Sequence, residues 1–176
     1  EKARFEVRID PLTEPGQNGM DRVEFMLSAN PGESLKPLEK VASGGEMSRI
    51  MLAFKAIAAN ADSIPTLIFD EIDTGISGHI AAVVGEKMVS IADNHQVLCV
   101  THLPQIAALA DVHFMVQKQD DGQTTRTSLK RLEMEERYEY IARMMSGMED
   151  SKLAYEHARE LITHSEEIKQ KRRKNK

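Results

Sequence analysis

Apolar and polar residues alternate in two segments near the start of the sequence. The alternating apolar positions are Phe5, Val7 and Ile9 in the first segment and Val23, Phe25 and Leu27 in the second. A period of two is typical of a β-strand with one buried face, and the prolines and glycines between residues 11 and 19 indicate a loop. The pattern predicts a half-buried antiparallel pair over residues 5–10 and 23–27, with a second loop over residues 30–37.

The next segment, from about residue 46 to residue 61, has the spacing of an amphipathic helix. Its apolar stripe consists of Met47, Ile50, Met51, Phe54, Ile57 and Ala58, which share one face at helical periodicity. Ser43 and Glu46 have the spacing of a capping box, in which the two side chains bind free backbone N–H groups at the start of a helix.

Two continuously apolar segments follow, over residues 66–70 and 96–100. Such segments are typical of strands that are buried on both faces of a parallel sheet. Ser77 can cap a helix between them, and Pro104 suits the first turn of a short helix after the second strand. This alternation of strands and helices predicts an α/β fold with a mainly parallel sheet flanked by helices and joined by right-handed crossovers.

The last third of the chain has the pattern of a β-hairpin followed by two helices. Asp120-Asp121-Gly122 is a turn signal between two strands within residues 112–129. The helices are predicted over residues 133–146 and 151–167, with Gly147 ending the first of them. Residues 169–176 contain six basic residues and no acid. We therefore expect one lobe over residues 1–168 and a disordered basic tail over 169–176, for which a contact to nucleic-acid phosphates is the alternative interpretation.

Composition narrows the class of protein only moderately. The chain has 176 residues, of which 41% are hydrophobic and 29% charged, as in soluble globular domains. No segment is apolar enough to cross a bilayer and the first residues lack a signal-peptide pattern, so we expect a cytoplasmic protein without membrane contact. A formal net charge of -5 does not favour a uniformly nucleic-acid-coating surface. Cys99, the single cysteine, lies in an apolar strand and is predicted to be an inert core thiol.

Polar side chains follow both predicted parallel strands at their carboxyl ends. Asp70 and Glu71 end the first strand, and Thr101 and His102 follow the second. Ligands of open α/β sheets gather at this edge. Asp70 suits Mg²⁺, which prefers carboxylate and phosphate oxygens, and Glu71 could orient or deprotonate an attacking water. The position of His102 makes it a candidate sensor of a terminal phosphate.

The Ser43-Gly44-Gly45 turn indicates a second phosphate contact. Two glycines allow an anion to approach the backbone closely, and the helix behind them offers free N–H groups and the positive end of its dipole. The sequence contains no Gly-x-x-x-x-Gly-Lys-[Ser/Thr] loop, so nothing in it is predicted to wrap the phosphates of a nucleotide.

Two short motifs point to other classes of enzyme. Gly75-Ile76-Ser77-Gly78 lacks the second spacer of a nucleophile elbow, which excludes a serine hydrolase on this motif. Asp70-Glu71-Ile72-Asp73 matches the Asp-Glu-x-Asp box of helicases. A helicase lobe would need its own phosphate loop upstream, and it would not explain residues 43–49.

Three motifs in order carry a resemblance to a known family. They are Val41-Ala42-Ser43-Gly44-Gly45-Glu46-Met47-Ser48-Arg49, then residues 67–78 with Asp70-Glu71-Ile72-Asp73-Thr74-Gly75, then Cys99-Val100-Thr101-His102-Leu103-Pro104-Gln105. Over residues 5–164 the chain resembles the C-terminal half of the RecN family of bacterial DNA repair proteins, relatives of the SMC ATPases. The resemblance implies the C-terminal lobe of an ABC-type ATPase head, with a β-hairpin and C-terminal helices.

The same resemblance implies a role for each motif residue. Ser43, Gly44, Gly45 and Glu46 would form the signature motif, which contacts ATP bound to a second head. Asp70 would be the Walker B ligand of Mg²⁺, Glu71 the catalytic base, and His102 the switch histidine. Asp73 would belong to the D-loop, which couples the two sites of a head dimer. ATP and Mg²⁺ are the cofactors that this assignment expects.

The implied partners lie outside the chain. They are an N-terminal half that carries the Walker A loop, a second head in an ATP-dependent homodimer, and DNA, as double-strand break ends or single strands. The implied activity is ATP hydrolysis in recombinational repair at the nucleoid, with this chain inactive alone. Two alternatives stay open at this point: a non-catalytic module that binds DNA or a partner, and a helicase lobe.

Overall fold

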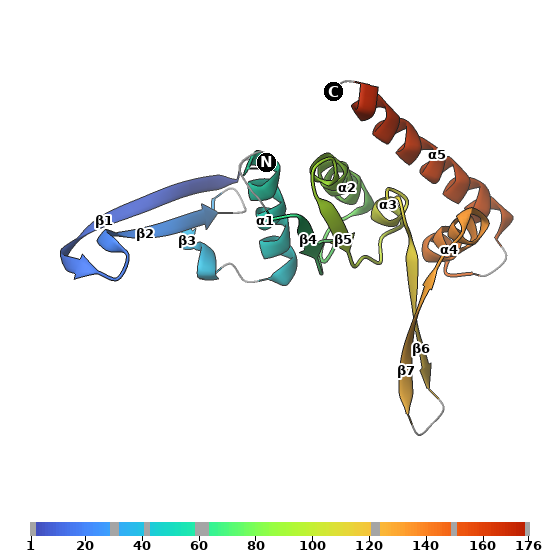
Figure 1. Ribbon diagram of the computed structural model, residues 1–176, viewed down its shortest axis with the longest axis horizontal. Helices are drawn as coiled ribbons and strands as arrows, with labels where there is room; N and C mark the ends of the chain where they lie inside the picture. Colours follow the sequence, from blue (N-terminus) through green and yellow to red (C-terminus); the bar gives the residue numbers. More distant parts are fainter. Residues whose placement is uncertain are drawn as a thin grey trace. The chain divides into compact units, whose positions relative to one another are not determined.

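The computed structural model describes residues 3–28, 32–40, 43–58, 64–120, 124–148 and 151–174. It divides into two compact units, residues 1–47 and residues 48–176, which are described separately below. Figure 1 labels the helices and strands of both. Within the described ranges, no helix is both long and apolar enough to span a membrane.

The first unit is built around a long antiparallel ribbon. β1 (Arg4–Gly16) pairs with β2 (Gly19–Ser28), and β2 pairs with the short β3 (Lys36–Pro37), which leads into a 3-10 helix, η1 (Leu38–Lys40). This confirms the predicted antiparallel pair. The strands extend further than predicted, because the pairing continues through a register shift between Pro11 and Gly16 and the turn is confined to the two residues before Gly19.

The predicted half-burial of this ribbon is wrong for the described chain. Every residue of β1 is exposed, and the alternating apolar side chains stand on an open face, where the rings of Phe5 and Phe25 stack at a centroid distance of 5.9 Å. In the unit, Met26 and Ser28 at the end of β2 are buried. The alternation therefore identifies the apolar face correctly, but no described element of this unit covers it.

Helix α1 (Gly44–Ala58) begins in the first unit and continues into the second. One of the two predicted bonds at its start is present, since the Glu46 N–H donates to Ser43 Oγ at 3.2 Å. In the second unit, the α1 residue that enters the core is Leu52, whereas Ile57 is 85% exposed. The predicted apolar stripe is therefore not the face of α1 that packs on the core.

The second unit contains the predicted parallel pair. β4 (Thr66–Phe69) and β5 (Gln96–Cys99) are parallel and in register, with Ile68 opposite Leu98. They are connected through α2 (Gly78–Ala92), and α3 (Pro104–Ala107) follows β5. The core beneath them comprises Leu52, Leu67, Phe69, Ile72, Ala81, Val84, Met88, Ile91 and Ile106.

One face of this pair is buried and the other is open, contrary to the prediction of burial on both faces. Leu67 and Phe69 point into the core, whereas Ile68 is 71% exposed and its neighbour Leu98 is also exposed. Val100 is exposed too and lies two residues beyond Leu98, so it continues the same face. The open side of the sheet is consequently apolar.

The remaining elements extend this unit toward its C-terminus. β6 (Phe114–Asp120) and β7 (Thr125–Arg131) form the predicted antiparallel hairpin, which projects away from α4 in Figure 1; residues 121–123 of its predicted turn lie outside the described ranges. α4 (Met134–Ser146) starts with a capping box of Glu133 and Glu136 and ends at Gly147 in the left-handed conformation (φ 67°), as predicted. α5 (Lys152–Lys174) packs on α4 through a second core of Ala108, Ile141, Ala142, Ala154, Ala158 and Ile162.

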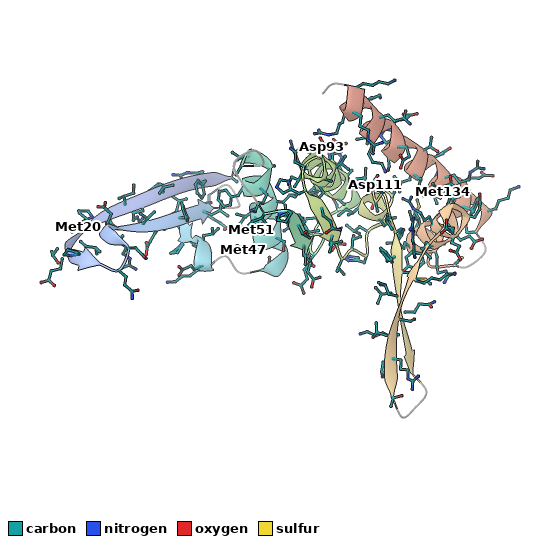
Figure 2. The ribbon with its side chains drawn as sticks, in the orientation of Figure 1. Met20, Met47, Met51, Asp93, Asp111 and Met134 are labelled. Atoms are coloured by element: carbon teal, nitrogen blue, oxygen red, sulfur yellow. The ribbon has the colours of Figure 1, made fainter. Side chains whose placement is uncertain are left out.

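The predicted disordered tail is wrong for residues 169–174, which form the last turns of α5; residues 175 and 176 lie outside the described ranges. Lys169 is buried, and its Nζ lies 3.0 Å from the Asp111 carboxylate. Arg172 donates to Asp93 at 3.0 Å and to Ser90 at 2.9 Å. Figure 2 labels the two acidic partners, Asp93 and Asp111. Two basic residues that were predicted to lie in a disordered tail, Lys169 and Arg172, are therefore bound to acidic residues elsewhere in the unit.

We expect Lys169→Ala to destabilise the second unit by about 1–2 kcal/mol, because it leaves Asp111 and Glu166 without the cation between them. The matched control is Lys171→Ala, which removes an exposed cation from the same turn and should cost less than about 0.5 kcal/mol. Urea unfolding of both variants measures the difference. Equal, near-zero effects would show that the end of α5 is not anchored.

Candidate functional site

The candidate site lies at the carboxyl ends of β4 and β5, where the predicted residues do come together. Asp70 and Glu71 follow β4, and Thr101 and His102 follow β5. The parallel register continues to this edge, because the Val100 N–H donates to the Phe69 carbonyl at 3.0 Å. The side chains of Asp70, Glu71 and His102 are exposed, whereas Asp73 is buried, with 3% of its surface accessible.

Asp70 and Glu71 stand on a tight turn that holds Glu71 in an unusual conformation. Glu71 has a φ of 58° and is the one non-glycine residue with positive φ among those described. Its N–H donates to Asp70 Oδ1 at 3.0 Å, and its carbonyl accepts the Thr74 N–H at 3.1 Å. Left-handed backbone in a non-glycine residue is costly and persists where surrounding contacts enforce it, which is common at functional sites.

Side chains from α1 supply those contacts. Ser48 Oγ donates to the Asp70 carbonyl at 2.9 Å, and Arg49 Nη1 donates to the carbonyls of Ile72 and Thr74 at 3.2 Å and 2.9 Å. Ile72 itself is fully buried. Helix α1 and the turn are thereby fixed to each other through backbone carbonyls, while the side chains of Asp70 and Glu71 stay exposed to a ligand.

Sequence reasoning did not assign a role to Ser48 or Arg49. Both lie just after the Ser43-Gly44-Gly45-Glu46 motif, as two polar residues between Met47 and Ile50 of the apolar stripe. That interruption of the apolar pattern was the signal available. Ser43 to Glu46 themselves belong to the first unit, where Gly45 is buried and Ser43 holds the start of α1.

Asp73 connects the turn after β4 with the end of β5. Its Oδ2 accepts the Thr101 hydroxyl at 2.6 Å and the His102 backbone N–H at 2.8 Å, and it lies 3.1 Å from His102 Nδ1. Burial raises the pKa of the Asp73 carboxyl, but the hydrogen bonds from Thr101 and His102 and the charge of His102 together outweigh burial and hold the pKa below its ordinary value. The buried carboxylate is thus stabilised in its charged form.

Cys99 at the end of β5 is not part of this chemistry. Burial, with smaller contributions from Asp73 and Asp70, raises the pKa of its thiol to about 12. Only the thiolate is strongly nucleophilic, so the structure agrees with the predicted inert thiol.

The carboxylates of Asp70 and Glu71 are ligands of the kind that Mg²⁺ takes in phosphate-transfer sites. Within the described residues, no three His, Cys, Asp or Glu side chains gather into a metal-binding group. Magnesium in phosphate-transfer sites takes one or two carboxylates together with phosphates and water. Asp70, exposed beside Glu71, can supply such a ligand.

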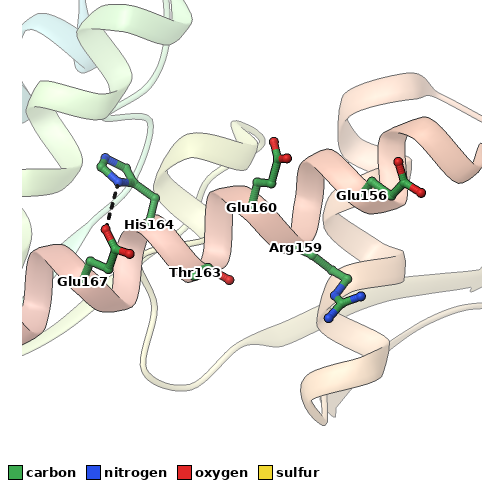
Figure 3. A pocket seen from close by; sticks show the side chains of 6 residues that line it. All are labelled: Glu156, Arg159, Glu160, Thr163, His164 and Glu167. Carbon is green, nitrogen blue, oxygen red and sulfur yellow. Dashed lines mark ion pairs between the residues drawn. The ribbon is translucent and has the colours of Figure 1, made fainter.

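A shallow hollow along α5 is lined by Glu156, Arg159, Glu160, Thr163, His164 and Glu167 (Figure 3). All six side chains come from one helix, and the one ion pair drawn among them joins His164 to Glu167 at 3.8 Å. None of the predicted site residues lines it. The strand-end edge, where groups from two strands and a helix converge, is therefore the better candidate site.

Comparison with solved structures identifies the class of fold. A structure from a study of ATP-driven dimerization and DNA-stimulated activation of SMC ATPases matches with a TM-score of 0.50 and 22% identity over 81% of this chain and 82% of that one. An Smc head domain with a coiled coil and joint from Pyrococcus yayanosii matches with a TM-score of 0.52 and 22% identity, over 81% of this chain and 26% of that one. The chain therefore has the α/β fold of an SMC ATPase head lobe, as predicted.

Sequence comparison gives the closer relationship. The chain is 49% identical over 173 residues to the DNA repair protein RecN of Halalkalibacterium halodurans, 46% identical over 154 residues to that of Bacillus subtilis, and 49% identical over 160 residues to that of Deinococcus radiodurans. These alignments cover 96%, 87% and 91% of this chain. The chain is thus homologous to a segment of the RecN proteins, which confirms the resemblance.

The matched segment is a minor part of each relative. The chain spans 31%, 27% and 28% of the length of the same three proteins. No protein-family model matches the sequence.

The backbone of Glu71 leads to a stability prediction. Glu71→Asn should be more stable than Glu71→Gln by about 0.5–1 kcal/mol, because asparagine tolerates the left-handed region better than glutamine. Glu86, exposed in α2, is the matched control. There the order should reverse, since glutamine is the better helix former. Denaturant unfolding of the four variants measures both differences, and the same order at both positions would contradict the strained turn.

The lowered pKa of Asp73 predicts how stability depends on pH. As the pH falls, the unfolded chain binds the proton first, so the stabilisation from Asp73 is fully present above about pH 4 and is lost as the pH falls through the lower folded pKa. Unfolding of the wild type and of Asp73→Asn should therefore show a shallower acid dependence in the variant. Parallel curves would contradict a carboxylate held in its charged form.

Proposed function

We propose that this chain is the C-terminal lobe of an ATPase head that acts in repair of DNA double-strand breaks. The observation that carries the proposal is the strand-end edge, where Asp70, Glu71 and His102 converge on the fold of an SMC head. Homology to proteins named DNA repair protein RecN supports the biological role. The complete ATPase would use ATP and Mg²⁺ and act on DNA ends or single strands at the nucleoid.

In this proposal the residues of the edge have separate tasks. Magnesium, when bound, would neutralise phosphate charge as the terminal phosphate is transferred to water. Asp70 would hold the ion. Glu71 would orient the attacking water and accept its proton. The turn that holds Glu71 at a positive φ would set the direction in which its side chain leaves the backbone. His102 would contact the terminal phosphate.

Ser43, Gly44, Gly45 and Glu46 are proposed to bind the terminal phosphate of ATP on a second head. The support is local: Ser43 caps α1, and the exposed Gly44 leaves its backbone at the start of that helix open to an anion. This assignment requires an ATP-dependent dimer of heads, which the work on the SMC structural neighbour describes for SMC ATPases.

A separate segment must supply the phosphate loop, and the chain has a surface suited to receive it. Ile68, Leu98 and Val100 form an open apolar face on the parallel pair, where parallel strands are ordinarily covered. More than two thirds of the length of each relative lies outside the matched segment. We propose that the segment with the Walker A loop covers this face and completes the head.

The test is ATP hydrolysis by this chain, alone and assembled with the segment of its own protein that carries the phosphate loop. We expect no turnover by the chain alone and Mg²⁺-dependent turnover, stimulated by DNA, in the assembly. Glu71→Gln should lower kcat of the assembly by about 10²–10⁴-fold, whereas Glu86→Gln, an exposed change on α2, should leave it unchanged.

Each contrary result has a definite meaning. Turnover that survives Glu71→Gln would refute the proposed base. Turnover by the chain alone would refute the requirement for a second segment. An assembly that forms but never hydrolyses ATP would instead favour a non-catalytic module that binds DNA or a partner.

A further inference from the structure

Asp73 makes contacts that its predicted D-loop role does not include. Asp73 is buried, with 3% of its surface accessible. Its carboxylate accepts hydrogen bonds from Thr101 and His102 of the same unit. Thr101 Oγ1 in turn accepts the Leu103 N–H at 3.1 Å. The hydrogen bonds of the Asp73 side chain therefore lie within its own unit.

The contact with His102 determines the state of the imidazole. Oδ2 of Asp73 lies 3.1 Å from His102 Nδ1, and an ionised carboxylate can only accept hydrogen bonds. A proton on Nδ1 suits this contact in the neutral ring, and it leaves Nε2 as the free nitrogen. The imidazole as a whole is open to a ligand, since the side chain of His102 is 72% exposed.

The same contact suits a ring that meets a phosphate. Phosphate oxygens accept hydrogen bonds, so a ring that binds one through Nε2 while donating from Nδ1 carries a proton on both nitrogens. The Asp73 carboxylate then forms an ion pair with the charged ring and neutralises it from behind. The orientation of the imidazole is thereby set before the ligand arrives, and the carboxylate that balances its charge is already in place.

We propose that Asp73 is a positioning residue for His102, which it holds with Nδ1 protonated and Nε2 directed to the terminal phosphate of the nucleotide. The identity of the ligand in this inference rests on the proposed ATPase function, whereas the contact between Asp73 and His102 does not depend on it. A second structural element takes part, because the turn that carries Asp73 is fixed by Arg49 through the carbonyls of Ile72 and Thr74. The arrangement assigns to Asp73 a task inside one lobe.

Nitrogen NMR of the histidine rings in this chain tests the geometry without any nucleotide. We expect the neutral His102 ring to be protonated at Nδ1. Asp73→Asn should keep that tautomer, because the amide oxygen can still accept, whereas Asp73→Ala should shift the ring toward the Nε2-protonated form that free histidine prefers. Thr101→Val is the matched control, since it removes another bond to the same carboxylate and should leave the tautomer unchanged.

Two results would overturn the proposal at this stage. One is an Nε2-protonated ring in the wild type, which needs no variant and so does not depend on how well Asp73→Ala folds. The other is an equal tautomer shift in Thr101→Val and Asp73→Ala, which would mean that general loosening of the turn, rather than the lost bond to His102, controls the ring.

Turnover of the assembled ATPase gives the second readout. Asp73→Asn keeps the acceptor but removes the charge that balances the phosphate-bound ring, so it should lower kcat by about tenfold or more with little change in KM for ATP. It should have no further effect when His102 is already replaced by alanine. Independent, multiplying effects of the two substitutions would refute the positioning role while leaving the ATPase proposal intact. If the wild-type assembly does not hydrolyse ATP, the ATPase proposal fails, and the NMR result still decides the geometry.

Discussion

The buried carboxylate of Asp73 holds together the two strand ends on which the candidate site is built. It sits on the turn after β4 and binds the backbone and side chains that end β5. Ser48 and Arg49 fix the same turn from the side of α1. With the turn bound from both sides, Glu71 can be kept at a positive φ. The backbone that carries Asp70, Glu71 and His102 is thereby held in place, and preorganised groups are what electrostatic and acid–base catalysis requires.

Local signals in the sequence predicted most of the elements and the edge of the sheet where the site residues meet. The alternation near Phe5, the cap at Ser43 and the stop at Gly147 each depend on neighbours within a few residues, and the structure contains all three. The meeting of Asp70 with His102 followed from one rule of parallel sheets. The bonds of Asp73 could not be predicted in this way, because they join residues 28 and 29 positions apart and depend on the shape of the turn.

Burial was the least predictable property, for a physical reason. An apolar pattern shows which residues avoid water, but not which chain covers them. Ile57 and Ile68 were predicted to be buried and are exposed in the described chain, whereas the cations Lys169 and Arg172 were predicted to be solvated and are bound to acids. The open apolar faces are those expected of a lobe that another segment completes, in keeping with relatives of which this chain spans about three tenths.

In the proposed ATPase, the terminal phosphate of ATP would lie at the edge formed by β4 and β5. The most direct measurement is a crystal structure of the complete head with Mg²⁺ and an ATP analogue that is not hydrolysed. We expect the ion beside Asp70, a water between Glu71 and the terminal phosphate, and His102 Nε2 in contact with a phosphate oxygen. A nucleotide bound with its terminal phosphate away from these three side chains would contradict the account.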